Sequence, residues 1–180
     1  MRLSVDDYMQ MPEDGKRYEL VEGELIVSPS PKRFHQEIVG ELYEAIKIWV
    51  RTEGLGKVLV APLDYKIDDH NVVQPDILYL PKSHPQYDDY DALLSEPPGL
   101  VVEVLSPGRA KHDLQTKFAL YQRAGVPCYW IADYDREIME AWELKKGVYV
   151  QSHHAKGRVF SAPPFPKLAL KLNEIFARGK

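Results

Sequence analysis

The sequence predicts an α/β fold in which a mixed β-sheet packs against helices. Short apolar runs bounded by Pro or Gly, which are typical of buried strands, occur at residues 73–80, 100–106 and 127–132. Segments with helical periodicity at residues 33–53 and 109–124 alternate with these runs. Because alternating strands and helices bury their apolar faces against one another, we expect a sheet covered by helices.

Length and composition indicate one ordinary globular domain over residues 1–180, with 44% hydrophobic and 28% charged residues. A single cysteine, Cys128, excludes an internal disulfide and a cysteine-based zinc site. The first seven residues contain no apolar signal core, and no apolar run reaches transmembrane length. We therefore expect a cytoplasmic protein that does not contact a membrane.

The N-terminal part predicts a short helix, a hairpin and a long helix. Ser4 caps the predicted helix at residues 4–10. Residues 17–27 predict a hairpin that turns at Glu22 and Gly23, because their apolar residues partly alternate. A longer helix is expected at residues 33–53, because apolar residues recur there at steps of three and four.

The remaining segments predict a third strand, a long loop and an antiparallel meander. The third strand is expected at residues 57–67, followed by a tight turn at 68–71. Residues 81–98 are rich in Pro, Asp and Tyr and predict a loop with one short helix near residues 90–94. Pro107 and Gly108 are expected to turn the chain into the 109–124 helix. The meander and a closing helix are predicted at residues 138–144, 148–152, 159–160 and 172–177.

The net charge of −4 argues mildly against a nucleic-acid partner, but the charges are unevenly distributed. Residues 60–100 carry eight Asp and Glu against two Lys, whereas residues 145–180 carry eight Lys and Arg against one Glu. This asymmetry suits an acidic metal pocket beside a basic surface for phosphates. Two solvated faces of an ordinary protein are the simpler interpretation.

Two apolar strands each carry one carboxylate, Asp76 and Glu103. A charge inside such a run is costly unless it is paired or binds a metal. Carboxylates on neighbouring strands are a common site for Mg²⁺, which prefers oxygen ligands and retains several waters. The alternative, which spacing alone favours, is a pair of carboxylates near strand ends that face solvent.

The helix after Glu103 carries Asp113, Lys117 and Tyr121 on one face, at steps of four. A helix that directly follows the Glu103 strand is expected to pack back across the sheet, which would direct Lys117 at the carboxylates. An ammonium there could orient a water or stabilise negative charge at phosphorus. An exposed Asp–Lys helix pair is the simpler alternative.

The hairpin and the long helix contain further candidate residues. Glu19, Glu22 and Glu24 could each be an additional metal ligand, and the sequence does not decide between Glu19 and Glu22. His35 at the start of the long helix could titrate near neutral pH or contact phosphate. Such a histidine is more often a surface or capping residue.

Six segments together resemble the Uma-type family of restriction-endonuclease-like proteins, once catalogued as a domain of unknown function within the PD-(D/E)XK nuclease superfamily. These segments are RYELVEGE (17–24), SPSP (28–31) followed by His35, VQPD (73–76), VVEVLSP (101–107), DLQTK (113–117) and YQRAGVPCYWIAD (121–133). The resemblance extends from about residue 4 to about residue 175. It implies the restriction-endonuclease-like fold and Mg²⁺-dependent hydrolysis of phosphodiester bonds.

Residue by residue, the resemblance implies that Asp76 and Glu103 are the acidic residues of the PD-(D/E)XK motif. The lysine of that motif would fall at position 105, where this sequence has Leu105. Lys117 matches the lysine that similar family members take from the following helix. Glu19 corresponds to an extra acidic residue ahead of the core.

The sequence thus predicts an Mg²⁺- or Mn²⁺-dependent nuclease that acts on DNA. Asp76, Glu103 and Lys117 are its predicted catalytic residues, and Glu19 is a third predicted metal ligand. A homodimer is expected if both strands of a duplex are cut. The alternatives are a catalytically inactive nucleic-acid-binding or regulatory protein on the same fold, and a structural protein whose carboxylates only pair with Lys or Arg.

Overall fold

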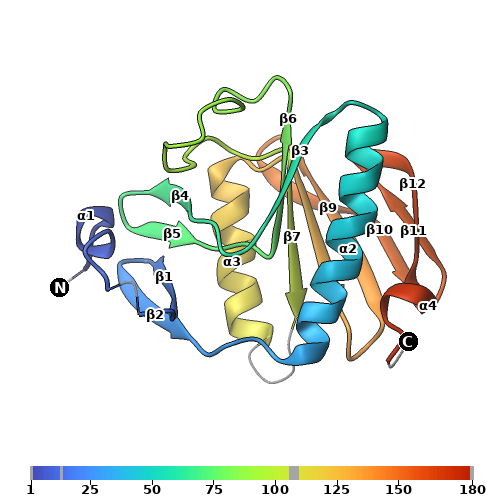
Figure 1. Cartoon of the computed structure of the whole chain (residues 1–180), viewed down its shortest axis with the longest axis horizontal. Coiled ribbons are helices and arrows are strands. Elements are labelled where there is room, and N and C mark those ends of the chain that lie inside the picture. Colours follow the sequence, from blue (N-terminus) through green and yellow to red (C-terminus); the bar gives the residue numbers. More distant parts are fainter. Residues whose placement is uncertain (1, 13, 106–109, 179–180) are drawn as a thin grey trace.

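The computed structural model describes residues 2–12, 14–105 and 110–178, without the side chains of residues 110–113. Its centre is a six-stranded mixed sheet of order β10-β9-β8-β7-β6-β3 (Figure 1). β7 and β8 are parallel and the other neighbours are antiparallel. The six strands are β3 (Gly56–Val60), β6 (Ile77–Pro81), β7 (Leu100–Leu105), β8 (Cys128–Asp133), β9 (Ile138–Lys145) and β10 (Val148–Lys156).

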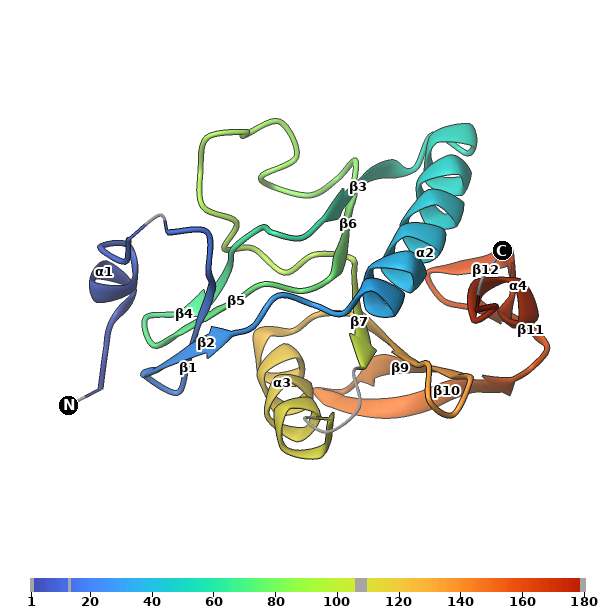
Figure 2. The same cartoon turned by 60° about the horizontal axis from the view of Figure 1, so that its bottom comes forward.

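Helices α2 (Arg33–Thr52) and α3 (Ala110–Ala124) cover opposite faces of this sheet (Figure 2). Alternate residues of β7 divide between the two cores, as the period of a strand requires. Leu100, Val102 and Val104 pack on the α2 side, whereas Val101 packs on the α3 side. Glu103 therefore projects toward α3.

A second sheet, of order β2-β1-β5-β4, lies at the N-terminal side of the molecule (Figure 1). Its strands and the adjacent helix are α1 (Val5–Tyr8), β1 (Arg17–Val21), β2 (Glu24–Ser28), β4 (Tyr65–Asp68) and β5 (Asn71–Val73). The C-terminal elements β11 (Val159–Ala162), β12 (Phe165–Lys171) and α4 (Leu172–Ile175) contribute to the core on the α2 side.

The predicted α/β class and most of the predicted elements are confirmed. Ser4 caps α1, accepting from Asp7 N at 3.3 Å while its own N–H donates to the Asp7 carboxylate at 2.8 Å. The hairpin turns at Glu22 and Gly23, which both have positive φ. The meander extends the central sheet through β9 and β10. Within the described residues no helix is both long and apolar enough to cross a membrane.

Two predicted strands are each divided in the structure. The 57–67 segment forms β3 and β4 with a break that contains Pro62, and the 73–80 segment forms β5 and β6 with a break that contains Pro75. Proline has no N–H to donate to a ladder, so both breaks have a local cause. Asp76 consequently lies in the bend before β6 and not inside a strand.

The predicted helix near residues 90–94 is wrong. Leu94 instead forms an isolated bridge with Tyr65, and its carbonyl accepts from Lys66 N at 2.8 Å. β12 was not predicted, because Pro166 interrupts its alternation. The predicted turn at Pro107 and Gly108 and the end of the 100–106 strand at Ser106 lie outside the described residues.

Candidate functional site

The register of β6 against β7 places Asp76 beside Glu103. Ile77 pairs with Val102 in this antiparallel ladder, so the next position on each strand brings residue 76 opposite residue 103. Both side chains are buried, with 3% of Asp76 and 6% of Glu103 exposed. Where β6 leaves the ladder, the Asp76 carboxylate accepts from Val104 N through Oδ2 at 2.8 Å.

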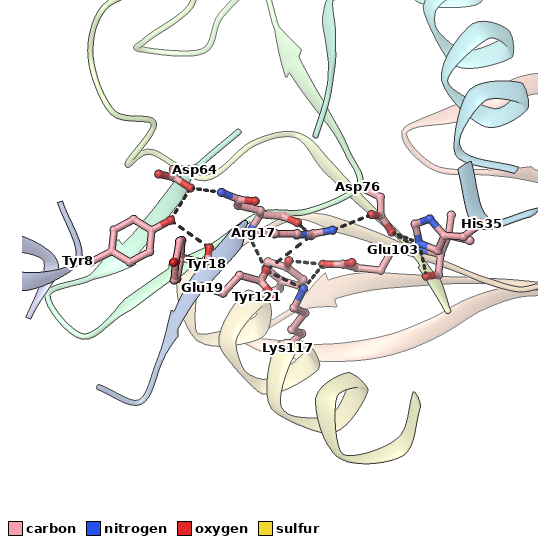
Figure 3. A network of polar contacts seen from close by, with 12 residues as sticks. Tyr8, Arg17, Tyr18, Glu19, His35, Asp64, Asp76, Glu103, Lys117 and Tyr121 are labelled. Atoms are coloured by element: carbon pink, nitrogen blue, oxygen red, sulfur yellow. Dashed lines mark hydrogen bonds and ion pairs between the residues drawn. The ribbon is translucent and has the colours of Figure 1, made fainter. Parts of the chain in front are cut away.

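Lys117 projects from α3 to these carboxylates, as predicted. Its Nζ donates to Glu103 Oε1 at 3.2 Å and to Glu19 Oε1 at 2.9 Å (Figure 3). One turn further along α3, the hydroxyl of Tyr121 donates to the same Glu103 oxygen at 2.6 Å. The side chain of Asp113, predicted on this face, lies outside the described residues.

Glu19, rather than Glu22, joins the cluster. Glu19 is buried in the middle of β1, and its Oε1 also accepts from Gln74 N at 2.8 Å. Glu22 lies at the surface in the hairpin turn, where it pairs with Arg2 and Arg123 at 3.0 and 3.1 Å. The structure therefore distinguishes Glu19 from Glu22, between which the sequence did not decide. Glu24 is exposed, like Glu22.

Arg17 is a member of the cluster to which the sequence analysis assigned no role. Its guanidinium lies 3.5 Å from Asp76 Oδ1 and 3.7 Å from Glu19 Oε1, and it donates to the carbonyl of Gln74. Residues two apart on a strand share a face, so Arg17 and Glu19 project to the same side of β1. That spacing is the signal that could have found Arg17.

The expectation that His35 is a surface or capping residue is wrong. The first turn of α2 buries the ring against β7, where Nε2 lies 3.0 Å from Val104 O and 3.3 Å from Asp76 Oδ2. Both neighbours are acceptors, so Nε2 carries the hydrogen. His35 thereby contacts the carbonyl of the residue whose N–H binds Asp76, and both contacts hold Asp76 in place.

Burial and charge act in opposite directions on the two central acids. Burial dominates for Glu103 and, with the nearby Asp76 and Glu19 charges, raises its pKa to about 7 against the opposing Lys117 ammonium. Burial also disfavours ionised Asp76, but His35, Arg17 and the Val104 N–H outweigh it and lower the pKa of Asp76. For His35, burial is outweighed mainly by Asp76, so its pKa is raised.

The donor set fits a hard divalent cation held by two carboxylates and completed by water. The hydrogen bonds of Glu19 and Glu103 named above reach Oε1 of each carboxylate, whereas Asp76 accepts from Val104 N through Oδ2 and faces the Arg17 guanidinium through Oδ1 at 3.5 Å. No group of three or more His, Cys, Asp or Glu side chains in this part of the chain is placed to hold a metal. Mg²⁺ accepts such a site, since it commonly uses one or two carboxylates and retains several waters.

Comparisons with known proteins identify the family and the fold of the chain. No curated protein matches the chain. Among solved structures, a "putative nuclease belonging to DUF820" from Anabaena variabilis is similar, with a TM-score of 0.80 at 20% identity and 97% of each chain covered. At this identity the likeness shows the fold alone. A family model described as "Putative restriction endonuclease" matches residues 5–173, and the chain therefore belongs to this family, Uma2.

Proposed function

We propose that the chain is a divalent-metal-dependent endonuclease that hydrolyses phosphodiester bonds of DNA. Family membership supports nuclease as its class of activity. The observation that carries the proposal is the placement of Asp76 opposite Glu103 with the Lys117 ammonium 3.2 Å from Glu103. Two acids can hold a metal ion, and a lysine beside them can stabilise developing negative charge, so this set suits metal-assisted hydrolysis of a phosphodiester.

Asp76 and Glu103 would hold Mg²⁺ or Mn²⁺, and Glu19 is the candidate third ligand. A bound ion would supply Lewis acidity at phosphorus and lower the pKa of a coordinated water. Lys117 then donates a hydrogen bond to the attacking water or to the negative charge that develops at phosphorus. Tyr121 orients Glu103 through its hydroxyl, while the Val104 N–H and His35 orient Asp76.

A second candidate function is a nucleic-acid-binding or regulatory protein without catalysis. It is favoured by the cations already placed among the acids, since Arg17 and Lys117 contact all three carboxylates of the cluster. This alternative predicts binding that persists without metal and is insensitive to Asp76→Ala.

The proposal is tested by cleavage of supercoiled and linear DNA in Mg²⁺, in Mn²⁺ and in EDTA. We expect cutting by the wild type only with metal, and a loss of roughly a hundredfold or more in Asp76→Ala and Lys117→Met. Asp88→Asn is the matched control, because that carboxylate is exposed and pairs with Lys57 away from the cluster. Equal cutting by all variants would identify a contaminating nuclease and overturn the proposal.

The proposed reaction also bears on the oligomeric state of the protein and on its location in the cell. Cutting both strands of a duplex favours a symmetric homodimer, in which a two-fold axis relates two sites. We propose such a dimer in the cytoplasm. Sedimentation of the protein alone and with a DNA duplex tests it, and a monomer in both conditions contradicts it.

A further inference from the structure

A pocket of about 740 Å³ opens beside the carboxylate cluster. Its lining includes the connector between β2 and α2, with Pro29 and Pro31, and the segment after β3, with Pro62. The connector runs between the N-terminal sheet and the start of α2 (Figure 2). The volume lies within the range of roughly 300–1,000 Å³ that is usual for small-molecule sites.

The pocket and the cluster share two residues. Arg17 lines the pocket while its guanidinium reaches Asp76 and Glu19. Gln74 lines it too, and its backbone N–H donates to Glu19 at 2.8 Å. The pocket therefore adjoins the cluster at these two residues, although Glu19, Asp76 and Glu103 are not among its lining residues.

The lining combines two chemical characters of a site for a nucleobase, an apolar surface and hydrogen-bonding groups. Three prolines together with Val27 offer rigid apolar surface for a base. Gln36 and Ser30 offer hydrogen-bond donors and acceptors suited to a base edge. Lys16 and Arg17 also line the pocket, but Lys16 is paired with Asp14 at 2.6 Å and Arg17 with Asp76 and Glu19. Enzymes that take up a single base combine apolar contact with hydrogen bonds to the base edge in the same way.

We propose that this pocket holds one unpaired nucleotide of the substrate strand, adjacent to the phosphodiester that is cleaved. The inference rests on the proposed nuclease function and specifies its substrate. A base inside a duplex is stacked and paired, so it would have to be extruded before it could enter the pocket. Single strands, mismatches and loops are therefore bound in preference to a continuous duplex.

The test measures binding of a short fluorescent single-stranded oligonucleotide, DNA or RNA, and of its duplex, by anisotropy in EDTA. Val27→Glu places a charged side chain in the pocket, where Val27 is 45% exposed. Ile48→Glu is the matched control, because Ile48 on α2 is 49% exposed and does not line the pocket. Gln36→Ala is a second pocket variant, which remains informative if circular dichroism shows that Val27→Glu does not fold.

We expect both pocket variants to bind the single strand about tenfold more weakly than the wild type, equivalent to about 1.4 kcal/mol, and Ile48→Glu to bind normally. The duplex should also bind the wild type about tenfold more weakly than the single strand. Unchanged affinity in Val27→Glu and Gln36→Ala, or equal affinity for duplex and single strand, overturns the inference. This assay measures binding and not cleavage, so its outcome is independent of the cleavage assay described above. If the pocket variants weaken binding but the wild type cuts no DNA with metal, the nuclease function is refuted and the pocket's role in binding is not.

Discussion

Replacing Lys117 by Met is the most direct test of the charge arrangement in the cluster. The Lys117 ammonium lies between two buried carboxylates, 2.9 Å from Glu19 and 3.2 Å from Glu103. Methionine keeps much of the length and apolar volume of the side chain but removes the charge and its donors. The substitution therefore leaves two buried acids without their common cation.

The expected cost follows from what remains around the two acids. Removing one partner of a buried ion pair costs roughly 3–5 kcal/mol. Glu103 keeps the hydroxyl of Tyr121 at 2.6 Å, and Glu19 keeps Gln74 N at 2.8 Å, so we expect the lower end, about 3 kcal/mol near pH 8. That is a large part of a stability of about 5–15 kcal/mol.

The cost must also fall at lower pH. Burial raises the pKa of Glu103 to about 7 in the presence of Lys117, and loss of the ammonium raises it further. Below that pKa Glu103 takes up a proton and no longer needs a cation. Near pH 5.5 the ionic cost at Glu103 is gone, and what remains is the lost contact of Lys117 with Glu19, at about 1–2 kcal/mol.

Urea denaturation near pH 8 and near pH 5.5, in EDTA, measures both values. Lys171→Met is the control, because its ion pair with Glu174 at 3.1 Å is exposed and contributes at most about 1 kcal/mol. The reasoning is refuted if Lys117→Met costs no more than this control near pH 8. It is also refuted if the cost is as large near pH 5.5 as near pH 8.

Four further predictions follow from the same cluster. The first concerns the difference in unfolding free energy between the wild type and Glu103→Gln. This difference should fall by about 3 kcal/mol as pH rises from 4.5 to about 7, because the folded protein holds the Glu103 proton over that interval. Urea titrations at stepped pH measure the difference, and a value that does not change with pH contradicts the prediction. Tyr121→Phe removes the donor to Glu103 and should lower the unfolding free energy by about 1–3 kcal/mol in calorimetry, whereas no change would argue against that hydrogen bond. His35→Phe removes the Nε2 contacts with Val104 O and Asp76 Oδ2, although Asp76 Oδ2 keeps the Val104 N–H, and should cost about 1–3 kcal/mol in urea denaturation, more than any loss in the exposed His153→Phe. Mg²⁺ at a hundred times its Kd should stabilise the wild type by about 2.7 kcal/mol in thermal denaturation and leave the stability of Asp76→Asn unchanged. Equal stabilisation of both proteins would mean that the ion binds elsewhere.

Most of the central sheet and the site lysine could be predicted from local pattern. Apolar runs at 100–106 and 127–132 correspond to β7 and β8, and helical periodicity at 33–53 corresponds to α2. Lys117 could be placed because a helix that follows a parallel strand has few ways to pack back on the sheet. The resemblance to a known family then supported Asp76 and Glu103.

Residues whose role depends on distant segments could not be predicted in this way. His35 is buried only because β7 and the Asp76 bend meet the first turn of α2, and no pattern within α2 encodes that meeting. The choice between Glu19 and Glu22 depended on the turn, which directs Glu22 to Arg2 and Arg123 at the surface. Pro62 and Pro75 were visible signals whose effect on the strands was underestimated.

The pairing of Ile77 with Val102 has a consequence for how much the connection between β6 and β7 can vary. Because the ladder itself places residue 76 opposite residue 103, the intervening loop does not set the spacing of the two acids. Its tip at Tyr90 is exposed, and doubling the length of such a loop costs only about 0.6 kcal/mol of closure entropy. Insertions at this tip can therefore add new surface at the end of β6 away from Asp76, while the two carboxylates keep their positions.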